Sequence, residues 1–453
     1  MDQLLARGFL RESSDALPQQ SLDFQHEYFR RVIYEDLGTV QRRVLHRRTA
    51  EALLAIHRST LQAVTEEVAR HFEKAIDARA VPYLVRAAQQ AEKLFAYAHA
   101  TELYSRALAL HEICLADEPS GRFDLLLARE ALLDRQGRRA EQSKDIEALL
   151  TLAEALGDTD RQAVVYKLQV GFFTYTSQYG EAQYVGEQAL ALYRTAGDRA
   201  GEAQTLRELG FLHWSSGDYG TALAYGRQAL QLHRFLGDTG AEATALHNMA
   251  EIYRELGSPG QALELYEQAL NLHWAGMDPR GQGLTLYGMA HALRQRGDLQ
   301  RALTDYQRAF TLCQALGDQL MLSRIHHTLA SLQWEMGMQD QALAHIQHAL
   351  SISREIGYAP GIAYGLITLG HFYAQQGERH TARQYFEEAI AWLRLTENQV
   401  VLTETQARLD AVENGTLADI DRSTTMGWVK SHVALAEGKV YCEFESPMAR
   451  YKV

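Results

Sequence analysis

One residue pattern constrains this chain more than any other: alanines recur at a constant interval along much of its length. The repeated positions are Ala182, Ala222, Ala262, Ala302, Ala342 and Ala382. A second alanine follows each of them seven positions later, at Ala189, Ala229, Ala269, Ala309, Ala349 and Ala389. Residues seven apart lie on one face of a helix, two turns from each other. Small side chains at these places let neighbouring helices approach closely, so the pattern predicts a regular stack of helices.

Glycine and aspartate mark the ends of the expected helices. One glycine column comprises Gly217, Gly257, Gly297, Gly337 and Gly377, and a second comprises Gly197, Gly237, Gly317 and Gly357, with Met277 in the place of one glycine. Glycine just past a helix adopts the left-handed conformation that ends it. An aspartate after the second column, as in Asp238, can cap the next helix. Each unit therefore divides into two helices, which in the third regular unit should cover about 239–255 and 259–274.

Composition agrees with an all-α protein. The chain has 453 residues but only 7 prolines, and its formal net charge is −12. A strongly acidic chain should not bind nucleic acid through its overall field. The cysteines Cys114, Cys313 and Cys442 form no CxxC pair, no apolar run is long enough to span a bilayer, and the N-terminus does not read as a signal peptide. We therefore expect a cytoplasmic protein without a membrane segment.

The columns of small and bulky residues resemble the tetratricopeptide (TPR) repeat, in a variant whose unit equals the alanine interval and is longer than the common one. In the third regular unit the pattern is filled by Leu246, Met249, Ala250, Tyr253, Ala262, Tyr266 and Ala269. The resemblance implies a right-handed superhelix, an α-solenoid, whose concave groove is lined by the first helix of each unit. We expect six regular units over 158–397, irregular TPR-like hairpins over 59–157, and a capping helix with an unassigned tail over 398–453.

The TPR pattern also indicates which residues should face the groove. They come from four positions of each first helix and include cations, histidines and aromatic residues. The predicted groove residues are Lys167, Arg207, Phe211, Trp214, His247, Glu251, Arg254, Tyr287, His291, Arg294, Arg324, His327, Trp334, Tyr364 and His371. Over all the groove positions there are five Lys or Arg and only one acidic residue, Glu251, so we expect a basic and aromatic groove inside an acidic protein. Such a groove suits a protein or peptide segment, or a small anionic effector.

The N-terminal segment 1–58 does not follow the repeat. It resembles the last part of the winged-helix module in STAND-class signalling ATPases and related transcription regulators. The matching residues are Phe24, His26, Ile33, Tyr34, Leu37, Arg42, Arg43, Leu45 and His46. By the resemblance His26 would be a vestigial nucleotide contact, but the chain contains no G-x-x-x-x-G-K-[ST] motif. We expect a partial winged-helix remnant at 1–58, and a nucleotide-binding domain encoded upstream is a candidate partner.

No set of catalytic residues emerges from the sequence. There is no H-E-x-x-H and no G-x-S-x-G, and His345 with His348 are more simply explained as two exposed histidines than as metal ligands. We expect a non-catalytic binding scaffold without a cofactor or metal, as the sensor or interaction arm of a bacterial STAND-type regulator. Two alternatives stay open, a free-standing peptide-binding adaptor and a regulator of a phosphorelay or another enzyme.

Overall fold

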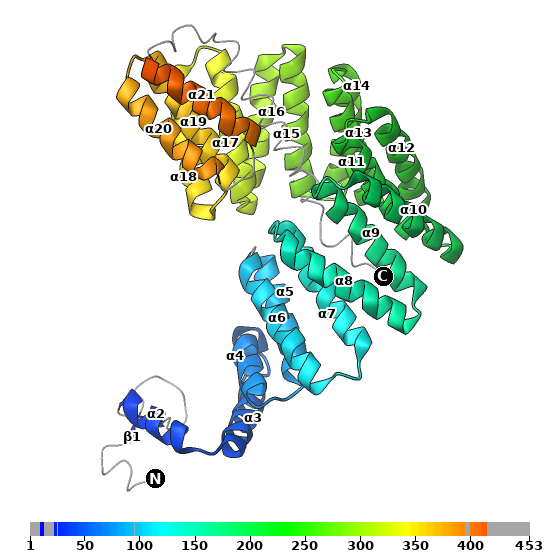
Figure 1. Cartoon of the computed structure of the whole chain (residues 1–453), viewed down its shortest axis with the longest axis vertical. Coiled ribbons are helices and arrows are strands. Elements are labelled where there is room, and N and C mark those ends of the chain that lie inside the picture. The colour runs from blue at the N-terminus through cyan, green and yellow to red at the C-terminus, as the bar shows by residue number, and fades with distance from the viewer. Residues whose placement is uncertain (1–9, 13–21, 25, 95, 395–398, 415–453) are drawn as a thin grey trace. The chain divides into compact units, whose positions relative to one another are not determined.

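The computed structural model describes residues 10–12, 22–24, 26–94, 96–394 and 399–414, in two compact units that divide after Val165. The described part is almost entirely helical (Figure 1). The expected all-α architecture is thereby confirmed. Within these residues, every helix is too short or too polar to cross a membrane. The expected tail from residue 415 onward lies outside the described residues.

The N-terminal unit begins with a short antiparallel pair of strands, β1 (Leu10–Glu12) and β2 (Leu22–Phe24), in which Leu10 lies opposite Phe24. Helices α2 (Glu27–Asp36) and α3 (Thr39–Ile56) follow. The origin of these strands and helices as a winged-helix remnant stays a prediction. None of the residues of α2 is buried, and Val32 and Ile33 on it are exposed.

The rest of this unit consists of packed helices around a core that includes Phe72, Leu84, Leu103 and Leu132. The helices are α4 (Leu61–Lys74), α5 (Ala80–Lys93), α6 (Tyr97–Cys114), α7 (Pro119–Arg135) and α8 (Arg139–Leu156). Helix α9 (Thr159–Tyr175) runs across the division into the second unit.

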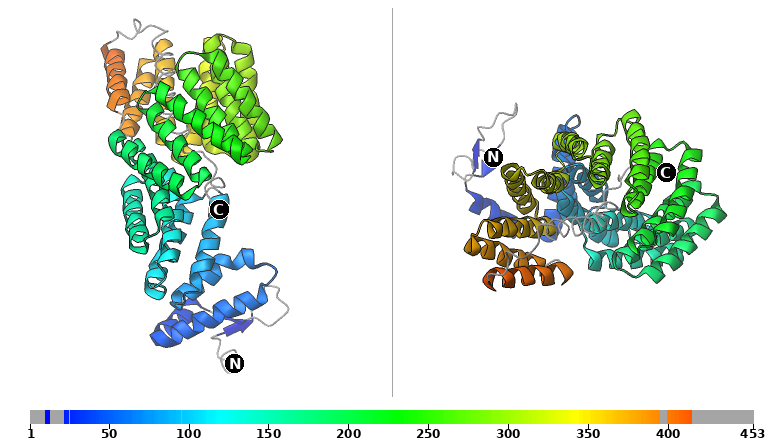
Figure 2. Two further views of the ribbon diagram at one scale, coloured as in Figure 1. Left: turned by 90° about the vertical axis from the view of Figure 1, so that its right-hand side faces the viewer. Right: turned by 90° about the horizontal axis from the view of Figure 1, so that it is seen from above.

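The second unit is a series of antiparallel helix pairs that stack one after the next (Figures 1 and 2). Its helices are α10 (Tyr179–Ala196), α11 (Arg199–Ser215), α12 (Tyr219–Leu236), α13 (Thr239–Glu255), α14 (Pro259–Ala275), α15 (Pro279–Arg296), α16 (Leu299–Leu316), α17 (Gln319–Glu335), α18 (Gln339–Ile356), α19 (Ala359–Gln375), α20 (Arg379–Leu393) and α21 (Gln399–Asn414). The predicted bounds of the third regular unit agree with α13 and α14 to within one residue.

The helix ends follow the glycine and aspartate columns. Gly237 after α12 has a φ of +69°, in the left-handed region, and the Asp238 side chain then accepts a hydrogen bond from the Ala241 N–H at 3.0 Å. Asp318 caps α17 in the same way through Met321 N–H. Met277 adopts a φ of +50° where its column otherwise holds glycine, although side chains disfavour that conformation. The glycines and caps thus fix the length of each helix pair and keep it constant from one pair to the next.

The alanine columns form the contacts between helices. Every alanine of both columns is at most 1% exposed, and the recurring pair of Ala262 and Ala269 is wholly buried. Large side chains such as Tyr306 and Leu286 fill the space around them. Neighbouring first helices, such as α13 with α15 and α17 with α19, also contact each other. The surface that the first helices α11, α13, α15, α17 and α19 present along the stack is here called the first-helix wall.

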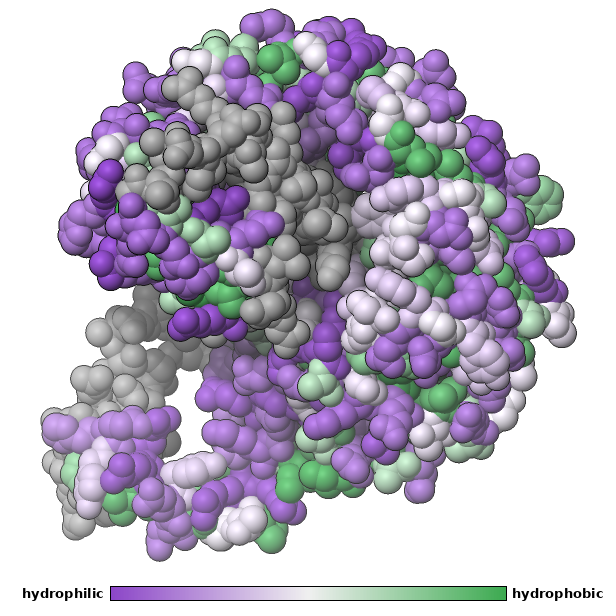
Figure 3. Space-filling view, turned by 45° about the horizontal axis from the view of Figure 1, so that its top comes forward, coloured by the Kyte–Doolittle hydropathy of each residue, from purple (hydrophilic) through white to green (hydrophobic). Residues whose placement is uncertain are grey.

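The face of the molecule seen in Figure 3 is mostly hydrophilic, with small separate apolar patches. Exposed apolar side chains lie mainly near the ends of second helices, such as Phe235 in the last turn of α12 and Trp274 in the last turn of α14.

Candidate functional site

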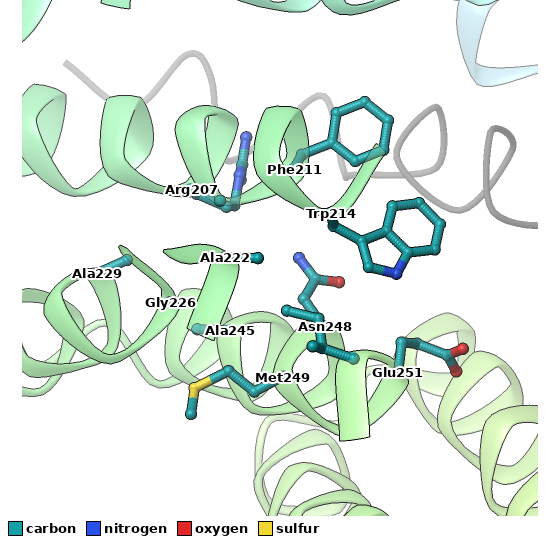
Figure 4. A pocket seen from close by; sticks show the side chains of 12 residues that line it. Arg207, Phe211, Trp214, Ala222, Gly226, Ala229, Ala245, Asn248, Met249 and Glu251 are labelled. Carbon is teal, nitrogen blue, oxygen red and sulfur yellow. The ribbon is translucent and has the colours of Figure 1, made fainter. Parts of the chain in front are cut away.

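A pocket in the first-helix wall contains four of the predicted groove residues. It lies where α11, α12 and α13 meet, and its twelve lining residues are Arg207, Gly210, Phe211, Trp214, Ala222, Gly226, Ala229, Ala245, Asn248, Met249, Glu251 and Ile252. Phe211 and Trp214 project from α11, and Asn248 and Glu251 from α13 (Figure 4). The lining is predominantly apolar with a few polar groups, as is usual for ligand pockets.

The pocket lies where the repeat holds a glycine in place of a large residue. The position of Gly226 on α12 corresponds, in the later repeats, to Tyr266, Tyr306, Ile346 and Phe386. The rings of Tyr266, Tyr306 and Phe386 are wholly buried between helices. Glycine at 226 leaves room at that place, which the Met249 side chain enters from one side, and Gly210, Ala222, Ala229 and Ala245 around it add little volume.

The same column holds a second glycine, Gly186 on α10, but there the space is already occupied. A Cβ atom at Gly186 would lie only 2.5 Å from Cδ2 of Leu209, so the leucine fills the place of the missing ring. At Gly226 the nearest atom to a Cβ is Cγ of Met249, at 3.0 Å, and the methionine side chain is flexible. The opening at Gly226 therefore has an adaptable floor.

A buried charge network stands at the α13 side of the pocket. The Glu251 carboxylate accepts two hydrogen bonds from Arg254, at 2.9 and 3.0 Å, and another from the Tyr266 hydroxyl. Burial alone would raise the pKa of Glu251, but Arg254 and His247 hold it below its usual value. Burial lowers the pKa of His247 to about 4. Glu251 is therefore a charged carboxylate at the pocket, and the positive charge of Arg254 already compensates its negative charge.

The α11 side of the pocket combines a cation with aromatic rings. Arg207 forms an ion pair with Glu208 at 2.9 Å. The ring of Phe211 lies 5.7 Å from that of Trp214 and 5.5 Å from that of Tyr175. The indole N–H of Trp214 is buried without a hydrogen-bond partner among the described residues. The carboxamide of Asn248 points across the pocket toward α11 (Figure 4). The indole and the carboxamide offer hydrogen bonds at an apolar pocket.

Four more predicted residues, Tyr287, His291, Arg294 and Arg324, form a second group, on α15 and α17. The Tyr287 side chain is wholly buried, its hydroxyl lies 2.8 Å from the Thr328 hydroxyl, and Arg324 stacks over its ring at 5.6 Å. His291 packs edge-on against Tyr306 at 5.3 Å, and burial keeps the pKa of His291 well below its usual value. Arg294 bonds Glu335 at 2.6 and 3.0 Å. These side chains connect helices to each other.

The predicted residues nearest the C-terminal end also pack within the stack. Trp334 lies edge-on to Phe372 at 5.7 Å, and His371 lies edge-on to Phe386 at 5.2 Å. Tyr364 is buried. Burial lowers the pKa of His327 to about 4 and, together with Arg408, that of His371 to about 3. Both histidines are therefore neutral at neutral pH.

The expected excess of positive charge on the wall is largely offset. Lys167 lies on the preceding helix α9 and donates to Gln204 at 2.6 Å, and four carboxylates lie among the predicted groove cations: Glu208, Glu251, Glu255 and Glu335. The prediction counted only Glu251, because Glu208, Glu255 and Glu335 each lie one residue away from a predicted groove position. Long side chains reach around the helix, so neighbours of the groove positions enter the same surface. The wall is therefore nearly balanced in charge.

His26, the predicted vestigial nucleotide contact, is exposed. It stands just before α2, with its ring 5.9 Å from that of Phe29. A nucleotide contact there stays a prediction. In the part of the chain that the structure describes, no group of three or more His, Cys, Asp or Glu side chains is arranged to hold a metal ion.

Sequence reasoning missed Gly226 and Asn248 as parts of the pocket. The sequence does contain a signal for Gly226, because glycine stands there in the column that otherwise contains Tyr266, Tyr306 and Phe386. Asn248 falls outside the four groove positions of its helix, and only the structure brings it opposite α11.

The comparison with protein families agrees with the repeat. A model described as the tetratricopeptide repeat matches residues 161–234, 201–273 and 282–355, and a further tetratricopeptide repeat model matches residues 363–391. A search of curated proteins returned no match.

Solved structures with a similar fold include a signal transduction ATPase with numerous domains (STAND) protein with a tetratricopeptide repeat sensor, from Pyrococcus horikoshii. The identity is 14% and the TM-score 0.52, over 90% of this chain and 60% of that one, so this chain spans about three fifths of that protein's length. Aspartyl phosphate phosphatase F from Bacillus subtilis matches at 12% identity and a TM-score of 0.45, over 74% of this chain and 94% of that one. A Rap protein complexed with Competence and Sporulation Factor matches at 15% identity and a TM-score of 0.48, over 80% of this chain and 99% of that one.

Proposed function

Since this chain is a tetratricopeptide-repeat protein that resembles the sensor region of STAND proteins, we propose that it binds a protein or peptide segment on its first-helix wall, with the pocket at α11–α13 as the main contact. Arrays of this family are in general interaction scaffolds rather than catalysts. The pocket carries the proposal, because it combines an open apolar space with aromatic walls and a few polar groups. Aromatic side chains in such places contribute most of the affinity of protein interfaces.

The charge balance of the wall favours a polypeptide over a small anionic effector. Arg207, Arg254 and Arg294 all have carboxylates within 3.0 Å. A free anion would have to compete with these internal partners. A polypeptide needs no excess of cations, because apolar contacts and main-chain hydrogen bonds hold it.

The biological setting that we propose is the sensor arm of a STAND-type regulator. Two observations support it: the motif residues from Phe24 to His46, and the apolar residues of α2 and α3, such as Ile33 and Val40, that stay exposed. An exposed apolar face of this kind suits contact with a further domain. A nucleotide-binding reading frame directly upstream would favour this setting, and its absence would favour the free-standing adaptor or a regulator of another enzyme.

Peptide selection tests the binding function without a known partner. We expect short linear peptides selected on the full chain from a random display library to depend on Trp214. Trp214→Ala should raise the dissociation constants of the selected peptides at least tenfold in a fluorescence anisotropy titration, because it removes an aromatic wall of the pocket.

The matched control is Trp274→Ala, since Trp274 is 56% exposed on α14, away from the pocket lining. It should leave the dissociation constants unchanged. Selected peptides that bind equally well to both variants and to the unchanged chain would show that the first-helix wall around the pocket is not the binding surface.

A further inference from the structure

We infer that the pocket is an unfilled aromatic position of the repeat and that the bound polypeptide fills it with one bulky apolar side chain. The inference rests on the proposed function and names the chemistry of its partner. Its starting point is internal to the chain: in other helix pairs the same place is filled by Tyr266, Tyr306 or Phe386, all wholly buried.

The neighbours of those rings show what the place accepts. Tyr306 contacts Tyr287 and His291 from the first helix of its own pair, with ring centroids at 5.6 and 5.3 Å. The corresponding residues around the pocket, two repeats earlier, are Arg207 and Phe211. A guanidinium group and an aromatic ring both pack well on a flat apolar group. An aromatic or long aliphatic side chain from outside would therefore find the same kind of walls.

The surroundings discriminate against polar occupants. In the next pair the Tyr266 hydroxyl donates to Glu251, whereas the residue that corresponds to Glu251 at the pocket is Phe211, which cannot accept a hydrogen bond. Glu251 itself lines the pocket but already accepts from Arg254 and Tyr266. A buried hydroxyl or charge without a partner is unfavourable. The pocket should thus prefer Phe, Leu or Met to Tyr, Glu or Lys.

Polar groups beside the apolar space suit a side chain that comes attached to a peptide backbone. The buried indole N–H of Trp214 has no hydrogen-bond partner among the described residues, and the Asn248 carboxamide points across the opening (Figure 4). A peptide carbonyl next to the apolar side chain would accept from such donors. A free hydrocarbon would leave the indole N–H as it is, so a polypeptide fits the site better.

The experiment fills the pocket from within the chain. In Gly226→Phe the new ring should occupy the place that Phe386 occupies in its own pair, with Met249 yielding at the floor. We expect this variant to bind the selected peptides at least tenfold more weakly. Gln228→Phe is the matched control, since it adds the same ring to an exposed position of α12 and should bind like the unchanged chain.

A double-mutant cycle identifies the side chain that enters. In each peptide, changing one bulky apolar residue to alanine should raise the dissociation constant at least tenfold for the unchanged chain. The same change should raise it less than twofold for Gly226→Phe. If Gly226→Phe does not fold, as shown by circular dichroism, Asn248→Phe takes its place, because Asn248 is only half-buried and its side chain already points across the pocket.

The outcomes separate this inference from the proposed function. Peptides that are weakened by Trp214→Ala but bind normally to the filled variants would overturn the inference and leave the wall as the binding surface. Peptides whose cycle shows no apolar residue coupled to position 226 would overturn it too. Peptides whose dissociation constants change neither with the filled variants nor with Trp214→Ala would contradict both this inference and the proposed function.

Discussion

At the scale of single residues, volume at the repeated positions decides whether a site is structural or open. Ala342 on α18 is wholly buried in the core that also contains Ile346 and Phe386. At such places a methyl group completes the contact between helices, whereas at Gly226 the lack of a ring leaves a pocket. The columns of small residues thus produce tight packing, and one of the two glycines in a column of large residues, Gly226, lines the candidate site.

We expect Ala342→Leu to destabilise the second unit by about 1–3 kcal/mol, since the added atoms must be accommodated in a packed interior. Ala344→Leu is the matched control, because Ala344 is exposed two positions away on the same helix. It should change stability by less than about 0.5 kcal/mol. Urea unfolding followed by circular dichroism measures both, and equal midpoints for the two variants would contradict the packing role of the alanine column.

The sequence predicts residue positions well where one residue type has one geometric role. Gly237 and Asp238 end and begin helices through left-handed backbone and side-chain capping, which are local effects, so helix bounds followed from them. The surroundings of Tyr287 and Arg294 depend instead on side chains one helix pair further along the chain, such as Thr328 and Glu335. Periodicity indicates the face of a helix but not the reach of a long side chain, so the charge balance of the wall could not be predicted.

At the scale of helices, polar bonds join successive first helices. The Tyr287 hydroxyl on α15 meets that of Thr328 on α17, and Gln295 on α15 donates to the Arg254 carbonyl on α13 at 3.2 Å. The partners lie 41 positions apart in both cases, one more than the repeat length. Polar contacts with the same sequence separation thus occur at two places where neighbouring first helices meet, and they limit sliding of one pair against the next.

We expect Arg294→Met to destabilise the contact between α15 and α17. The Arg294 and Glu335 side chains are only 9% and 17% exposed, so the change leaves a half-buried carboxylate without its arginine. Breaking a buried pair typically costs about 3–5 kcal/mol, and the lower end applies here because Glu335 keeps some contact with water. The free energy of unfolding in urea measures the loss.

The double variant Arg294→Met with Glu335→Leu is the control for that change. Replacing both partners by apolar groups should recover most of the stability, because no isolated charge then stays buried. If the double variant is as unstable as Arg294→Met, the loss comes from packing rather than from the ion pair.

At the scale of the whole molecule, the second unit contains several buried neutral histidines. Burial lowers the pKa of His326 to about 4, helped by His345 and His348, whose rings lie 5.0 and 5.4 Å from its own. The pKa values of His247, His327 and His371 are lowered by burial to about 4, 4 and 3. In the unfolded chain each of these groups has the ordinary pKa of about 6.5.

We therefore expect stability to fall as the pH falls from about 6.5 toward 5. In this window the unfolded chain binds protons that the folded protein does not, so the unfolded state is favoured by acid. Each fully neutral histidine contributes about 2 kcal/mol to this loss at pH 5, from about 1.4 kcal/mol per pH unit. His371→Leu should remove one proton from the pH dependence of the free energy of unfolding. A free energy of unfolding that is constant from pH 7 to 5 would contradict the expectation.

The constant distance from one aspartate cap to the next also bears on how such a chain can change over generations. Because Asp238, Asp278 and Asp318 stand at the same point of successive hairpins, recombination between any two of them removes or duplicates one whole hairpin or more. At the new junction each helix cap and each contact between small residues then has a partner of the same kind as before. The length of the binding face is adjustable in steps of one hairpin, while the pocket at Gly226 is inherited intact as long as the hairpin that holds it and the next one stay together.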